Sequence, residues 1–89
     1  MSTIKTIKQK LTSLNPEKIE IIDESSKHIG HEGAKNGGGH FLLTIVSGDF
    51  YKKSTIERHR IIYDALGKMV GRDIHALSIK ADTPEEISF

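Results

Sequence analysis

The chain has 89 residues, of which 36% are hydrophobic and 28% charged, and it contains no cysteine. This length allows one small domain, residues 1–89, and no second one. Thirteen basic and twelve acidic side chains leave a formal charge of +1, which argues against a strongly electrostatic nucleic-acid binder and a polybasic membrane anchor. No apolar run approaches the ~20 residues of a membrane span and no signal peptide opens the sequence, so we expect a cytoplasmic protein. Without cysteine, the chain can offer no disulfide, no catalytic thiol and no thiolate metal ligand.

The N-terminal half predicts a helix, a strand and a long loop. The helix is capped by Ser2 or Thr3 and ended by Asn15-Pro16. Its apolar side chains recur at helical spacing: Ile4, Ile7, Leu11 and Leu14. Lys18–Asp23 alternates as a strand does. Residues Glu24 to Gly39 are polar and contain five glycines, which predicts a loop of a length that is often functional.

The C-terminal half opens with the strongest strand, His40–Ser47, whose apolar residues on both faces indicate a central position. Ser54 and Glu57 have the spacing of a capping box, in which each side chain satisfies the other's backbone N–H, so a helix begins here. Gly71 is its expected end. The expected apolar stripe of this helix, with His59 as a core histidine, is Ile56, His59, Tyr63, Leu66 and Val70.

A third strand and a short terminal helix complete the predicted order. Ile74–Ile79 reads as the strand, and Thr83-Pro84-Glu85-Glu86 has the pattern of a capped helix start. The order is therefore α-β-β-α-β-α. The first two strands can pair antiparallel across the loop, and the helical crossover makes the third strand parallel to the second. We expect an α/β domain with a three-stranded mixed sheet and both long helices on one face.

Histidine supplies the first candidate site. His28, His31 and His40 lie in or beside the glycine-rich loop, and His75 begins the third strand. Neutral imidazole is a common metal ligand, and a flexible loop lets ligands converge. The alternative is that the three loop histidines are solvated and His75 packs at the sheet edge. Spacing alone does not decide between these interpretations.

A basic cluster near the start of the second helix supplies the other candidate site. It consists of Lys52, Lys53, Arg58 and Arg60. A helix N-terminus favours anions, so phosphate contacts are physically sensible here. The simpler interpretation is a solvated helix face.

Several motifs of known chemistry are missing or misplaced. Gly30-His31-Glu32-Gly33 has the letters of the GxxG loop that clamps phosphates in KH domains, but it joins two strands instead of two helices. The sequence has no Walker loop and no nucleophile elbow with serine, histidine and carboxylate. We therefore expect neither an enzyme nor a small-molecule substrate.

A set of short strings, taken in order along nearly the whole chain, resembles the BolA family. The strings are Asp23-Glu24-Ser25, the histidine-bearing loop, His40-Phe41, Val46-Ser47, Phe50, Arg58-His59-Arg60, Tyr63, Leu66, His75-Ala76-Leu77 and Thr83-Pro84-Glu85-Glu86. The resemblance implies an α/β fold similar to the class II KH arrangement. It also implies a monothiol glutaredoxin with a Cys-Gly-Phe-Ser site as the partner.

The resemblance further implies a [2Fe–2S] cluster shared with the glutaredoxin and glutathione, and no cofactor in the isolated chain. On the BolA side the ligands are the histidine of His-Ala-Leu, which is His75 here, and a cysteine or histidine from the loop. Because cysteine is absent, this chain is similar to the histidine type. His28 matches the loop ligand best, His31 can compete with it, and His40 matches a histidine before the second strand.

Two other functions stay open at this point. Some members of the family are described as transcriptional regulators, so a KH-like nucleic-acid-binding protein that contacts DNA weakly through Lys52, Lys53, Arg58 and Arg60 is the alternative. A pure interaction module without metal is the third. Co-purification with a glutaredoxin and glutathione, followed by a visible spectrum, discriminates between them.

Overall fold

The computed structural model describes residues 3–24 and 39–87. Its helices and strands are α1 (Thr3–Leu11), β1 (Lys18–Asp23), β2 (Gly39–Val46), α3 (Thr55–Leu66), β3 (Ile74–Asp82) and α4 (Pro84–Ile87). Short 3₁₀ turns occupy Thr12–Leu14, Gly48–Phe50 and Gly67–Met69. None of the described helices is long and apolar enough to cross a membrane.

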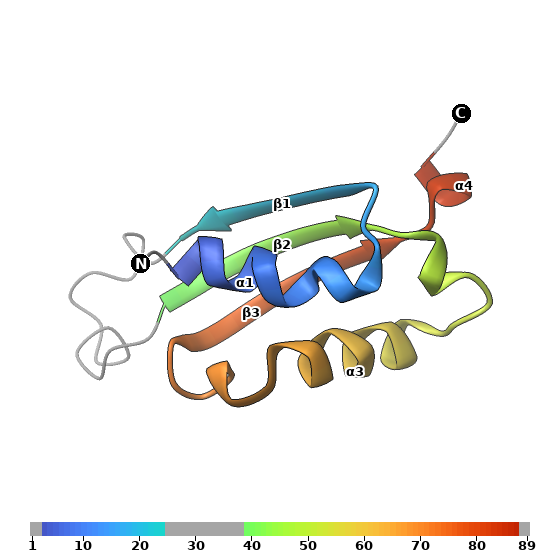
Figure 1. Cartoon of the computed structure of the whole chain (residues 1–89). Coiled ribbons are helices and arrows are strands. Elements are labelled where there is room, and N and C mark those ends of the chain that lie inside the picture. Colours follow the sequence, from blue (N-terminus) through green and yellow to red (C-terminus); the bar gives the residue numbers. More distant parts are fainter. Residues whose placement is uncertain (1–2, 25–38, 88–89) are drawn as a thin grey trace.

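The sheet has the predicted topology. Its order is β1-β2-β3, with β1 antiparallel and β3 parallel to the central strand β2. Figure 1 shows α1 and α3 side by side on one face of the sheet, and α4 at the end where β3 finishes. The α/β architecture with both long helices on one face is confirmed, while the class II KH description stays a prediction.

The core lies between this face of the sheet and the two long helices. Its largest fully buried side chains come from every layer and include Ile7, Leu11, Leu43, Ile45, Phe50, Ile62 and Leu66. On β2 the buried residues alternate along the strand because successive side chains point to opposite faces. The sheet face away from the helices carries the residues of the other parity, among them Ile22, which is 45% exposed.

The predicted apolar stripe of α3 is partly wrong. Ile56 is 65% exposed and Val70 is 40% exposed, whereas Ile62 is fully buried. The helix carries two apolar stripes that share Leu66, and the sheet covers the one that continues through Ile62. His59 is consequently half-buried and not a fully buried core residue.

Helix α3 also ends earlier than predicted, at Gly67 instead of Gly71. Gly67 has φ 59°, and its N–H donates to Tyr63 O. Gly71, with φ 91°, instead forms the turn that leads into β3. Both positions need the backbone freedom of glycine. The predicted start holds: the capping box joins Ser54 N–H to Glu57 Oε1 at 2.9 Å and Glu57 N–H to Ser54 Oγ at 3.1 Å.

Candidate metal centre

Two of the four candidate histidines meet where β2 and β3 begin. The ring centroids of His40 and His75 lie 5.2 Å apart, with the rings inclined by 48°. A register irregularity produces this contact: Gly39 pairs with Ile74, but His40 pairs with Ala76. His75 is therefore the extra residue of a bulge, and bulges redirect side chains. The regular alternation expected for this strand gives no hint of that irregularity.

A backbone hydrogen bond holds the two strand starts together: Gly39 N–H donates to Asp73 O at 2.9 Å. A second bond, from Glu24 N–H to His40 O at 2.7 Å, joins the start of β2 to the end of β1. His75 is exposed, whereas His40 is half-buried with its Nε2 atom shielded from solvent. The pair thus combines one ring fixed within the sheet with one ring open to a partner.

The other two candidate ligands, His28 and His31, lie outside the described residues. Within residues 3–24 and 39–87, no group of three or more histidine, aspartate and glutamate side chains is arranged to hold a metal ion. Of the four candidate histidines, the described part of the chain brings together His40 and His75.

The second candidate site, the basic cluster, is divided by the structure. Arg58 has only 11% of its side chain exposed and forms a two-pronged ion pair with Glu86, with N–O distances of 2.7 and 2.9 Å. It also donates from Nε to Lys53 O and from Nη1 to Ala81 O, each at 2.9 Å. Most of its donors are thus engaged within the domain. Lys52, Lys53 and Arg60 are exposed.

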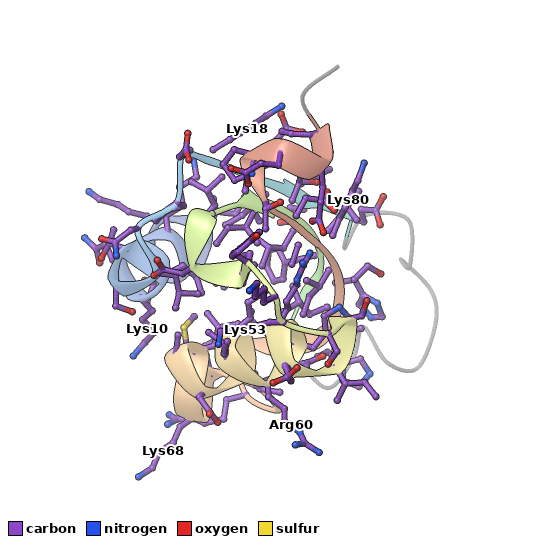
Figure 2. The ribbon with its side chains drawn as sticks, turned by 90° about the vertical axis from the view of Figure 1, so that its right-hand side faces the viewer. Lys10, Lys18, Lys53, Arg60, Lys68 and Lys80 are labelled. Carbon is purple, nitrogen blue, oxygen red and sulfur yellow. The ribbon has the colours of Figure 1, made fainter. Side chains whose placement is uncertain are left out.

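The exposed cations extend from more than one side of the molecule. In Figure 2, Arg60 and Lys68 extend from one side of the molecule, whereas Lys18 lies near α4 on the opposite side. Lys52 Nζ lies 5.6 Å from the ring centroid of its neighbour Tyr51. A phosphate backbone is bound best by charges that converge on one strip of surface. Lys18 therefore does not form such a strip together with Arg60 and Lys68.

The Arg58–Glu86 ion pair also fixes α4 to the start of α3. Hydrogen bonds from Arg58, and then from the backbone of Thr83, lower the pKa of Glu86 from its ordinary 4.5 to about 2. The same pair, led by its hydrogen bond, raises the pKa of Arg58. Thr83 N–H donates to Glu86 Oε1 at 2.8 Å and Glu86 N–H to Thr83 Oγ1 at 3.3 Å, which forms a second capping box. The spacing of Thr83 and Glu86 in the sequence predicted this capping box, but it did not predict the ion pair between Glu86 and Arg58.

Comparison with known proteins decides the family. The family model described as BolA-like protein matches residues 11–86. The chain belongs to the BolA family. The BolA domain of SufE1 from Arabidopsis thaliana superposes with a TM-score of 0.83 at 42% identity, covering 98% of this chain and 99% of that one. BolA1 from the same plant gives 0.81 at 32% identity, covering 97% and 96%.

BolA-family relatives differ in how much of their length this chain spans. It is 42% identical over 91% of its length to SufE-like protein 1, chloroplastic/mitochondrial, from Arabidopsis thaliana, but covers only 24% of that protein. It is 36% identical over 83% of its length to BolA-like protein 1 of Mus musculus and covers 52% of it. A Sinorhizobium protein described as uncharacterized is 38% identical, with 97% of this chain and 96% of that one covered. The chain thus spans about a quarter of one relative and half of another.

Proposed function

We propose that this BolA-family domain is an iron–sulfur adaptor that binds a monothiol glutaredoxin and shares a glutathione-supported [2Fe–2S] cluster with it. The observation that supports the proposal is the pair of imidazoles, His40 and His75, brought to 5.2 Å at one end of the sheet. His75 is the histidine of the His-Ala-Leu string that resembles the family's ligand. His40 is the nearby ring, and His28 and His31 remain candidates for the second ligand.

The donor set fits a shared cluster better than a resident one. Iron–sulfur clusters are held by thiolates, and histidine replaces some of them in certain centres. This chain has no cysteine and five histidines. It can therefore contribute imidazole ligands only, and the thiolates have to come from glutaredoxin and glutathione. That division of ligands makes the domain an adaptor and not an enzyme.

Histidine ligation has two chemical consequences for such a cluster. An imidazole in place of a thiolate raises the reduction potential of the cluster. A histidine also leaves its metal when it is protonated, so the bond weakens as pH falls towards the imidazole pKa. Both properties suit sensing or transfer better than storage. The exposed position of His75 leaves that ligand accessible to a partner.

The experiment that tests the proposal is anaerobic co-purification with a Cys-Gly-Phe-Ser glutaredoxin and glutathione, followed by a visible spectrum. We expect a coloured heterodimer whose spectrum differs from that of the glutaredoxin cluster alone. The domain alone and the glutaredoxin alone are the controls. A mixture whose spectrum is the sum of the two controls would contradict the proposal. Imaging of a tagged chain in its host cell tests the cytoplasmic location that we include in the proposal.

Nucleic-acid binding is the alternative function, and we expect it to be weak and non-specific. Arg58 is engaged with Glu86, which leaves three exposed members of the cluster: Lys52, Lys53 and Arg60. The affinity for duplex DNA should therefore fall steeply as salt rises and be lost near physiological ionic strength. A fluorescence-anisotropy titration over a salt series measures this. A sequence-specific complex that survives physiological salt would reverse our ranking of the two functions.

A further inference from the structure

The sheet has one face that none of the described helices covers. Helices α1 and α3 pack on the other face, and α4 lies at one end of the strands (Figure 1). The open face carries the even-numbered residues of β1 and β2 and their partners in β3, since the odd-numbered Phe41, Leu43 and Ile45 are buried in the core. Ile22 is 45% exposed on this face. Such a face can be covered by a second sheet.

One cross-strand row gives the open face opposite charges at its two edges. The register aligns Glu20 of β1, Thr44 of β2 and Lys80 of β3. Glu20 and Lys80 are exposed, with the half-buried Thr44 between them. Figure 2 shows Lys80 on the side of the molecule away from α1. Within the described residues, no hydrogen bond or ion pair engages the side chain of Glu20 or Lys80. Both charges are therefore available to a partner.

The neighbouring row is apolar at two of its three positions. It aligns Ile22, Leu42 and Ser78. Ile22 is exposed, and Leu42, although it belongs to the central strand, is only half-buried. Residues two positions apart on a strand point to the same face, so this row lies directly beside the charged one. The open face thus combines apolar surface with one charge of each sign.

A second copy of this face matches these charges in one orientation. A two-fold axis along β2, between two facing sheets, exchanges their edges, so β1 of each copy lies opposite β3 of the other. Residues keep their height along the strands. Glu20 of each copy therefore faces Lys80 of the other, and Leu42 faces Leu42 at the axis. An axis across the strands, centred on the same row, would instead set Glu20 against Glu20 and Lys80 against Lys80.

We propose that two copies of this domain associate face to face through the open side of the sheet, about a two-fold axis along β2. The occupant is a second copy because the face is complementary to itself in charge. A three-stranded face measures roughly 14 Å by 20 Å, or about 300 Å², which is less than the ~800 Å² per partner of a standard interface. We therefore expect a weak dimer, populated at about 0.1–1 mM chain.

The test is sedimentation velocity on the full chain alone over a concentration series, so it does not depend on the proposed function. Glu20→Lys and Lys80→Glu should each raise the dimer dissociation constant about 3- to 30-fold, because each reversal replaces two attractive contacts with two repulsive ones. The double variant should return it to near the wild-type value. Asp64→Lys on α3 and Lys10→Glu on α1, both exposed, make the same two changes in net charge away from the open face and are the matched controls.

Methyl NMR with a soluble paramagnetic probe supplies an independent measurement of the buried face. Rising concentration should shield the methyl groups of Ile22 and Leu42, while those of Ile56, which is 65% exposed on α3, should stay accessible. A chain that stays monomeric up to about 1 mM would overturn the proposal. So would a double variant no stronger than the single reversals, or a dimer that shields Ile56 and not Ile22. Thermal melting of every variant verifies that each one is folded.

Discussion

His75→Ala will remove the domain's histidine ligation of the shared cluster while leaving its fold intact. The side chain is exposed and lies against the ring of His40, so its loss opens no cavity in the core. Loss of a ligand or of its support typically costs ~10–100-fold or more in metal affinity. The visible spectrum of the complex with glutaredoxin and glutathione should shift towards that of the glutaredoxin cluster alone. Thermal melting should stay close to wild type.

A matched histidine variant separates ligation from stability. His59→Ala removes a half-buried ring on α3, outside the candidate site, so it should lower the melting temperature and leave the spectrum unchanged. If His75→Ala instead keeps the wild-type spectrum, or unfolds the protein, His75 is not a ligand.

The second ligand is identified by comparing the remaining histidines in the same assay. A His40→Ala effect as large as that of His75→Ala would assign the second position to the ring that the described structure places nearby. A small effect there, with a larger one for His28→Ala, would assign it to the loop. His28→Ala alone should act less strongly than His75→Ala because His31 can replace it.

Much of the fold could be predicted from local patterns. The central position of β2 follows from apolar residues on both of its faces, and the crossover between β2 and β3 makes their pairing parallel. The starts of α3 and α4 follow from their capping boxes. The buried face of α3 did not follow, because the stripes through Ile56 and through Ile62 both have helical spacing. Only packing against the sheet selects between them.

The candidate site was less predictable than the fold, since both of its informative contacts are tertiary. The contact between His40 and His75 depends on a bulge where β3 begins, and no residue type in this segment predicts that bulge. Arg58 lies among other cations in the sequence, which suggested a phosphate-binding role. Its partner Glu86 is 28 positions away in the sequence, and the course of β3 brings the two side chains together. The residue types thus indicated which chemical groups are available, namely imidazole and guanidinium. The tertiary fold determined which partners these groups contact.

Arg58→Ala will cause the largest loss of stability among single changes to the basic cluster. The guanidinium links three segments: the Lys53 carbonyl before α3, the Ala81 carbonyl in β3, and the carboxylate of Glu86 in α4. An exposed ion pair alone contributes ~0–1 kcal/mol, but hydrogen bonds to a charged group contribute ~1.5–3 kcal/mol. Arg58 is mostly buried, so we expect a loss of about 2 kcal/mol, or about 10 °C in Tm. Urea unfolding measures it.

Two further variants show whether the geometry or the charge matters. Arg60→Ala removes an exposed cation from the same helix and should change stability by less than about 0.5 kcal/mol. Arg58→Lys keeps the charge but cannot form the two-pronged contact, so it should recover only part of the loss. Equal losses for the alanine variants at Arg58 and Arg60 would show that the ion pair does not stabilise the fold.

The ion pair also gives stability a pH dependence whose sign is fixed by Glu86. Its pKa falls from 4.5 to about 2 in the folded protein, so folding favours the ionised carboxylate. The stabilisation is complete above about pH 4.5 and is lost as pH falls from there through about 2. Glu86→Gln should therefore be less stable than wild type at neutral pH, and the difference should shrink steadily in acid. An unfolding series in which both proteins lose stability with the same slope below pH ~4.5 would exclude Glu86 as the group responsible.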